Sequence, residues 1–147
     1  MVDIRIPSMT LAEKQQRLAD DLAVIPDQHE RLNEVVTRAR RAPPLSDDER
    51  IDANRVRGCV SAVWLVGTVS DGRCYFRADA DGPLVKGLVT FLCDFFSGAT
   101  PAEIISSETN PLAALGLIRN LSPTRQNGLA SALATIRAFA NNQTGNR

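Results

Sequence analysis

The sequence predicts an α+β fold in which helices cover a small antiparallel β-sheet of about three strands. Two kinds of pattern lead to this prediction: amphipathic helical spacing near both ends of the chain, and β-rich runs between them. The dipeptide Asp71-Gly72 separates two of these runs and is typical of a hairpin turn. Strands that are consecutive in the chain, with helices before and after them, indicate an antiparallel sheet packed against helices.

The chain of 147 residues is long enough for one domain with a buried core. We predict a single domain over residues 1–147, with its core at about 10–140 and loose ends at 1–9 and 141–147. The basic and acidic residues balance at 17 each, which argues against a nucleic-acid partner. The sequence shows neither an apolar signal core nor a run long enough to span a membrane, so we expect a cytoplasmic protein without a membrane partner.

Helices are predicted first along the chain. Residues 10–13, Thr-Leu-Ala-Glu, have the spacing of a capping box, in which the threonine and glutamate side chains bond to backbone donors at a helix start. Residues 27–30 have a similar spacing and open a second helix, which Pro43-Pro44 stops. His29 falls in the first turn of that helix and is predicted to be exposed without a functional role. The polar residues 45–53 are predicted to form a surface loop.

The predicted strands follow. Residues 54–57 form a short extended run that ends at the corner Gly58-Cys59. Residues 61–69 are apolar on both faces, which is typical of a central strand. Residues 74–80 alternate between apolar and polar side chains, and this alternation points Cys74 toward the core.

The remaining chain is predicted to be helical. Asp81 or its neighbour caps an apolar helix over residues 84–96, and Cys93 lies on the buried face of that helix. Further helices are expected at 101–106, at 111–120 and from 123 onward, because a capping residue followed by proline opens each of them. Those capping residues are Thr100, Asn110 and Ser122.

Cys59 is the candidate reactive residue. Its neighbour Gly58 lets the chain turn sharply and allows a partner backbone to approach. Arg55 and Arg57 precede it, and cationic neighbours lower the pKa of a thiol and raise the thiolate fraction. The alternative is that Cys59 is a small core hydrophobe, as lone cysteines often are, and the local sequence leaves this alternative open.

Other kinds of site lack a pattern in this sequence. Three cysteines without a closely spaced pair, and a single histidine far from them, predict neither a disulfide framework nor a metal site. The sequence contains no glycine-rich phosphate loop, and the acidic pairs Asp20-Asp21 and Asp47-Asp48 lie in polar surface stretches. A single thiol beside arginines suits the exchange of sulfur with a partner protein better than stand-alone catalysis on a small molecule.

Three blocks of the sequence resemble the SufE family of sulfur acceptors. Residues 57–64, Arg-Gly-Cys-Val-Ser-Ala-Val-Trp, resemble its Gly-Cys-x-Ser-x-Val-Trp signature. Residues 79–88 resemble the segment that opens its central helix, and residues 121–129 resemble its Leu-x-Pro-x-Arg-x-x-Gly-Leu block. The resemblance covers roughly residues 27–140, in the order that the family has. It implies the fold shared by SufE and NifU (IscU-like) proteins.

The resemblance also implies a function. A pyridoxal-phosphate-dependent cysteine desulfurase (SufS-like) would transfer persulfide sulfur to Cys59 and be stimulated by this chain, and the sulfur would pass to an iron–sulfur scaffold (SufBCD-like). The cofactor would belong to the desulfurase, so no cofactor is expected on this chain. The binding residues that we assign beside Cys59 are Arg55, Arg57, Gly58, Ser61, Asp81 and Arg125. The arginines are expected to stabilise thiolate or persulfide, and Asp81 to brace the thiol loop.

Two alternatives to a sulfur carrier remain at this point. One is an IscU-like iron–sulfur scaffold, which needs several thiolates around one cluster. The other is a regulator that activates the desulfurase without carrying sulfur, in which case Cys59 would be dispensable.

Overall fold

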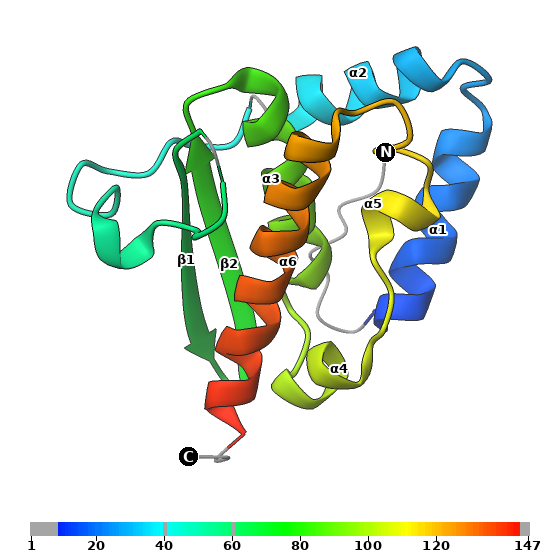
Figure 1. The fold of residues 1–147 in the computed structure, drawn as a ribbon. Coiled ribbons are helices and arrows are strands. Elements are labelled where there is room, and N and C mark those ends of the chain that lie inside the picture. Colours follow the sequence, from blue (N-terminus) through cyan, green and yellow to red (C-terminus); the bar gives the residue numbers. More distant parts are fainter. Residues whose placement is uncertain (1–8, 40, 60, 145–147) are drawn as a thin grey trace.

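The fold is a two-stranded antiparallel sheet with helices packed against one of its faces (Figure 1). The computed structural model describes residues 9–39, 41–59 and 61–144. The elements in chain order are α1 (Leu11–Ala23), α2 (Gln28–Ala39), the short 3-10 helix η1 (Asp52–Asn54), β1 (Val63–Ser70), β2 (Arg73–Ala80), α3 (Pro83–Phe96), α4 (Pro101–Ser106), α5 (Pro111–Ala114) and α6 (Pro123–Gln143). The predicted α+β class is therefore confirmed, while residues 1–8 of the loose arm expected at 1–9 lie outside the described residues.

The inner face of the sheet is covered by α3 and α6 (Figure 1). The strands pair in one register from Val63 opposite Ala80 to Ser70 opposite Arg73. Cys74 and Phe76 point inward and are buried, as the alternation in the sequence predicts. Phe139 of α6 lies edge-on to Phe76, with ring centroids 5.4 Å apart, and this contact holds the C-terminal helix on the sheet.

The prediction that residues 61–69 form a central strand is wrong. Among the described residues β1 pairs with β2 alone, and the expected third strand at 54–57 is reduced to one bridge between Arg55 and Trp64. The apolar outer face that suggested a central strand is instead partly covered by residues 45–54. The side chain of Glu49 pairs with Arg77, and Arg50 pairs with Asp79 at 3.2 Å, so two ion pairs fasten that segment to β2.

Capping side chains start most helices as the sequence predicts. Thr10 and Glu13 form the full capping box of α1, and Asp27 accepts hydrogen bonds from the backbone N–H groups of His29 and Glu30. Thr100, Asn110 and Ser122 each accept from backbone donors in the same way. Of the two predicted cap positions of α3, Asp81 or its neighbour, the neighbour Gly82 is the N-cap residue, and no side-chain cap bond forms there.

The last two helices differ in length from the prediction. Helix α5 ends at Ala114 instead of near residue 120, because Gly116 adopts a φ of 73° and turns the chain away from the helix axis. Helix α6 continues to Gln143, through residues expected to be loose, because its buried stripe extends to the fully buried Ala140. The expected loose residues 145–147 lie outside the described residues.

A buried lysine ties α1 to the C-terminal end of α3. Lys14 has a relative exposure of 0%, and its Nζ donates hydrogen bonds to the carbonyl oxygens of Phe95 at 2.9 Å and Ser97 at 2.7 Å. These carbonyls belong to the last turn of α3, which carries partial negative charge and favours a cation.

Candidate functional site

The thiol of Cys59 lies in the turn between η1 and β1. Gly58 supplies the turn with a φ of 88°, a left-handed conformation that disfavours other residues. A Cβ atom at Gly58 would lie 2.7 Å from the Oγ atom of Ser131 on α6. A side chain at Gly58 would displace the Ser131 hydroxyl, and the left-handed φ favours glycine there independently of that contact.

Helix α6 also provides a partner for the thiol itself. The Sγ atom of Cys59 lies 3.4 Å from the carbonyl oxygen of Gly128, to which the protonated thiol donates a hydrogen bond. Cys59 is half-buried by this contact. Gly128 belongs to the block at residues 121–129, but it is 69 residues away from Cys59 in the sequence, and no sequence pattern places the two together.

The electrostatic balance at Cys59 differs from the expectation. Burial raises the pKa of the Cys59 thiol, and the nearby positive charge of Arg55 offsets this only in part. The predicted lowering of the pKa by the arginines is therefore wrong for this conformation. A thiol held against a carbonyl oxygen is kept in its protonated, unreactive form.

We expect iodoacetamide to alkylate Cys59 slowly at neutral pH and faster as the pH rises toward its raised pKa. Arg55→Gln removes the charge that lowers the pKa, so alkylation at fixed pH should fall by about threefold. The rate of mass labelling at Cys59 measures this effect. Arg17→Gln, an exposed change on α1, is the matched control. A faster or unchanged rate in Arg55→Gln would contradict the assigned cause of the pKa balance.

A depression of about 380 Å³ opens beside the thiol. Its lining residues all come from one short segment, and they are Asp52, Arg55, Val56, Arg57, Gly58 and Cys59. The side chain of Val56 is buried, whereas Arg55 and Arg57 on either side of it are exposed. The structure thus brings together four of the predicted site residues, Arg55, Arg57, Gly58 and Cys59.

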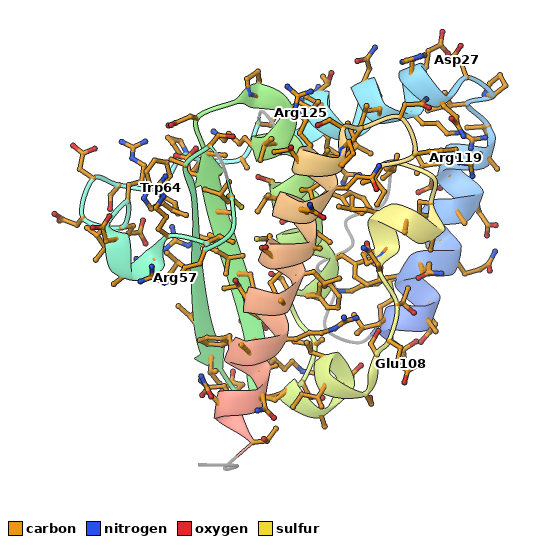
Figure 2. All side chains as sticks on the ribbon, viewed as in Figure 1. Asp27, Arg57, Trp64, Glu108, Arg119 and Arg125 are labelled. Atoms are coloured by element: carbon orange, nitrogen blue, oxygen red, sulfur yellow. The ribbon has the colours of Figure 1, made fainter. Side chains whose placement is uncertain are left out.

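The other predicted site residues lie apart from this depression. Arg125 is exposed in the first turn of α6, and Figure 2 shows it at the top of that helix, away from Arg57. The side chain of Asp81 is exposed. Its backbone N–H donates a hydrogen bond to the carbonyl oxygen of Ala62, three residues after Cys59, at 3.2 Å. Ser61 is exposed just before β1.

Asp79 is a structural residue whose role is not apparent from the sequence. Its carboxylate is 5% exposed and accepts hydrogen bonds from the backbone N–H of Leu45 and the guanidinium of Arg50, each at 3.2 Å. The Nζ atom of Lys86 on α3 lies 3.6 Å from the same carboxylate. Asp79, itself in β2, therefore connects two other parts of the fold to the sheet: the segment 45–50, which leads toward the thiol, and helix α3.

Cys74 and Cys93 are 0% and 1% exposed, which confirms their predicted place in the core. Burial raises the pKa of both thiols. In the described part of the chain, no group of three or more histidine, cysteine or acidic residues is arranged to hold a metal ion.

Gly58→Ala is expected to lower the free energy of unfolding by about 2 kcal/mol, from left-handed strain and the contact with Ser131 together. Gly72→Ala is the matched control, since Gly72 has a φ of 76° with no atom within 4 Å of the added Cβ. That control should cost only the strain, about 1 kcal/mol. Urea unfolding measures both. Equal losses in the two variants would contradict the close approach of the thiol turn to α6.

A comparison with protein families decides the relationship of this chain. The family model described as SufE, the Fe-S metabolism associated domain, matches residues 16–140. This chain belongs to the SufE family. The three sequence blocks that resemble the family lie inside the matched range, and Cys59 lies in the first of them.

Curated relatives support the same assignment. An uncharacterized SufE-like protein of Rhizobium etli is 33% identical over 129 residues, which cover 84% of this chain and 87% of that protein. An uncharacterized SufE-like protein of Synechocystis is 35% identical over 102 residues, 69% of this chain and 64% of the relative. A chloroplastic quinolinate synthase of Oryza sativa is 41% identical over 101 residues, which are 68% of this chain but 14% of that protein. The quinolinate synthase is therefore a much longer protein, and this SufE-family chain matches only a small part of it.

A solved structure shares the fold. The solution structure of a hypothetical protein from Thermus thermophilus covers 97% of both chains with a TM-score of 0.70 at 19% identity. At that identity the likeness concerns the fold of the SufE-family chain and not its function. None of the described helices is both long and apolar enough to cross a membrane.

Proposed function

We propose that Cys59 receives sulfur as a persulfide from a pyridoxal-phosphate-dependent cysteine desulfurase of the SufS type. The chain would stimulate that enzyme and pass the sulfur to an iron–sulfur scaffold of the SufBCD type. The observation that carries the proposal is the position of Cys59: it is the half-buried thiol at a surface turn, whereas Cys74 and Cys93 are sealed in the core. The family assignment, a domain associated with Fe-S metabolism, supports sulfur chemistry at this residue.

The transfer is a thiol exchange without net oxidation. The thiolate of Cys59 attacks the outer sulfur of the desulfurase persulfide, a new S–S bond forms on Cys59, and the desulfurase cysteine leaves as a thiolate. One sulfur atom has then moved, and the number of S–S bonds is unchanged. The reaction needs Cys59 in its deprotonated form.

Because Cys59 contacts Gly128 through its thiol proton, we expect deprotonation of the thiol to be coupled to a movement of Cys59. A thiol donates to the carbonyl oxygen at 3.4 Å, but a thiolate has no proton to donate and is repelled by the same oxygen. We therefore expect the reactive thiolate to leave its position on α6 and move outward. Gly58 lies next to Cys59 and can absorb the backbone rotation that this movement needs.

The burial of Cys74 and Cys93 favours a carrier over an iron–sulfur scaffold. A cluster needs several thiolates that converge on it. Cys74 lies on the inner face of β2 and Cys93 within α3, and each is surrounded by core side chains. A carrier needs only Cys59.

The test is the intact mass of the protein after incubation with a cysteine desulfurase and L-cysteine. Wild type should gain the mass of about one sulfur atom, reversibly on reduction. Cys59→Ser should gain none, while Cys74→Ala and Cys93→Ala should load like wild type after circular dichroism shows that they are folded.

Two outcomes would contradict the proposal. No gain by wild type with an active desulfurase would exclude a carrier, and stimulation of the desulfurase that persisted in Cys59→Ser would then identify a regulator. Loading that survives in Cys59→Ser would place the sulfur on another residue.

A further inference from the structure

We propose that the depression beside Cys59 binds a small anionic thiol, which pairs its carboxylate with Arg55 and Arg57 and collects the sulfur carried by Cys59. This inference deepens the proposed function and rests on it, because the sulfur must first be loaded. It assigns the chemistry of one acceptor: a low-molecular-weight thiol that carries a carboxylate.

The size of the depression suits a small ligand. Its volume of about 380 Å³ is in the lower range of small-molecule sites, which span roughly 300–1,000 Å³. Gly128, which holds the thiol on α6, is not among the lining residues. The ligand therefore approaches Cys59 from the side of the 52–58 segment, while α6 occupies another side of the cysteine.

The charges of the depression select an anion. Arg55 and Arg57 are two residues apart, and Val56 between them is 2% exposed, so the backbone directs the valine inward and leaves both arginines outside. Asp52 contributes the one carboxylate of the lining, which leaves a net positive charge. Guanidinium groups match the planar shape of a carboxylate and bind it through paired hydrogen bonds.

The reactive sulfur lies within the influence of these charges. Arg55 and Arg57 line the same depression as Cys59, and the charge of Arg55 lowers the pKa of the Cys59 thiol, although burial has the larger effect and raises it. A carboxylate bound between the arginines would thus be held beside the sulfur of Cys59. That arrangement brings a tethered thiol into reach of a persulfide, and holding two reactants together raises the rate of their reaction.

The transfer balances in atoms and electrons. The thiolate of the small molecule attacks the outer sulfur of the Cys59 persulfide, the S–S bond to Cys59 breaks, and Cys59 leaves as a thiolate. The small molecule departs as a persulfide, and no external oxidant or reductant takes part.

The charge preference is testable without a desulfurase, through the exchange of Cys59 with three aliphatic disulfides of similar size. These are 3,3′-dithiodipropionate, which is a dianion, neutral bis(2-hydroxyethyl) disulfide, and cystamine, which is a dication. Rates are read from the mixed disulfide at Cys59 by peptide mass. A change in the pKa of the thiol alters the thiolate fraction and affects all three rates by the same factor. Each rate is therefore divided by the rate with the neutral disulfide, which cancels this effect.

Wild type should prefer the dianion over the dication by about tenfold, and 0.5 M salt should weaken the preference. Arg55→Gln/Arg57→Gln should reduce the ratio to within about twofold of unity. Arg17→Gln/Arg119→Gln removes the same charge from exposed positions and should keep the wild-type ratio; Arg119 lies on the opposite side of the molecule from Arg57 (Figure 2). No preference in wild type, or an unchanged preference in Arg55→Gln/Arg57→Gln, would overturn the anion site.

A second arm tests the acceptor step on protein that has been loaded with sulfur. The rate of sulfur release from Cys59 is compared at equal concentrations of the thiolate form of each acceptor. Release to 3-mercaptopropionate should be about tenfold faster than release to cysteamine, and Arg55→Gln/Arg57→Gln should abolish the difference. Equal release to both thiols would overturn the acceptor role. Failure to load at all would instead contradict the proposed function, so the two failures are distinguishable.

Discussion

Asp79→Ala is expected to lower the free energy of unfolding by about 3 kcal/mol, since it removes a buried carboxylate from two cations. The backbone N–H of Leu45 also loses its acceptor. Arg50 and Lys86 are partly exposed and regain some hydration, which keeps the loss below that of a fully buried pair. Urea unfolding followed by circular dichroism measures the change.

The effect of Asp79 should also reach the thiol. Because Asp79 anchors the segment that runs from Leu45 toward Cys59, its loss should speed the alkylation of Cys59 under native conditions. Asp81→Ala is the control: this aspartate is exposed two residues further on and should cost no more than about 0.5 kcal/mol. If both variants were equally stable, the anchoring role of Asp79 would be refuted.

Lys14→Ala is expected to cost about 3 kcal/mol, because both its apolar stem and its ammonium group are buried. The carbonyl oxygens of Phe95 and Ser97 would lose a charged donor, and the end of α3 would lose a favourable cation. Thermal or urea unfolding measures the loss. No change in function beyond that of reduced stability is expected, since α1 contributes no residue to the depression at Cys59.

Lys14→Met separates the two contributions of the lysine. Methionine keeps most of the stem but cannot donate, so it should cost about 2 kcal/mol through the lost hydrogen bonds alone. Arg17→Ala, on an exposed face of the same helix, should change stability by less than about 0.5 kcal/mol. A Lys14→Met variant as stable as wild type would show that the bonds to α3 contribute nothing.

Features set by neighbouring residues were predictable from the sequence. The capping boxes at Thr10 and Thr100 need only residues three apart, so their spacing sufficed. The burial of Cys74 followed from alternation along one strand. Lys14 had a detectable signal, because it occupies a position at helical spacing within the buried stripe of Leu11 and Leu18.

Features set by distant residues were not predictable in this way. The alternation placed Asp79 on the outer face of β2, but it could not show that residues 45–50 fold over that face and bury it. Counting arginines near Cys59 predicted a lowered pKa, because sequence reveals charge but not desolvation. The contact with Gly128 arises only when α6 docks on the sheet.

The distance along the chain between Cys59 and Gly128 has a consequence for biosynthesis. The two residues are 69 positions apart, so during translation the thiol is made well before the helix that later shelters it. At roughly 5–20 residues per second, this interval lasts roughly 3–14 seconds. Throughout that time the acceptor of the Cys59 hydrogen bond has not been made. The shelter of this cysteine is therefore completed late, by the last helix of the fold.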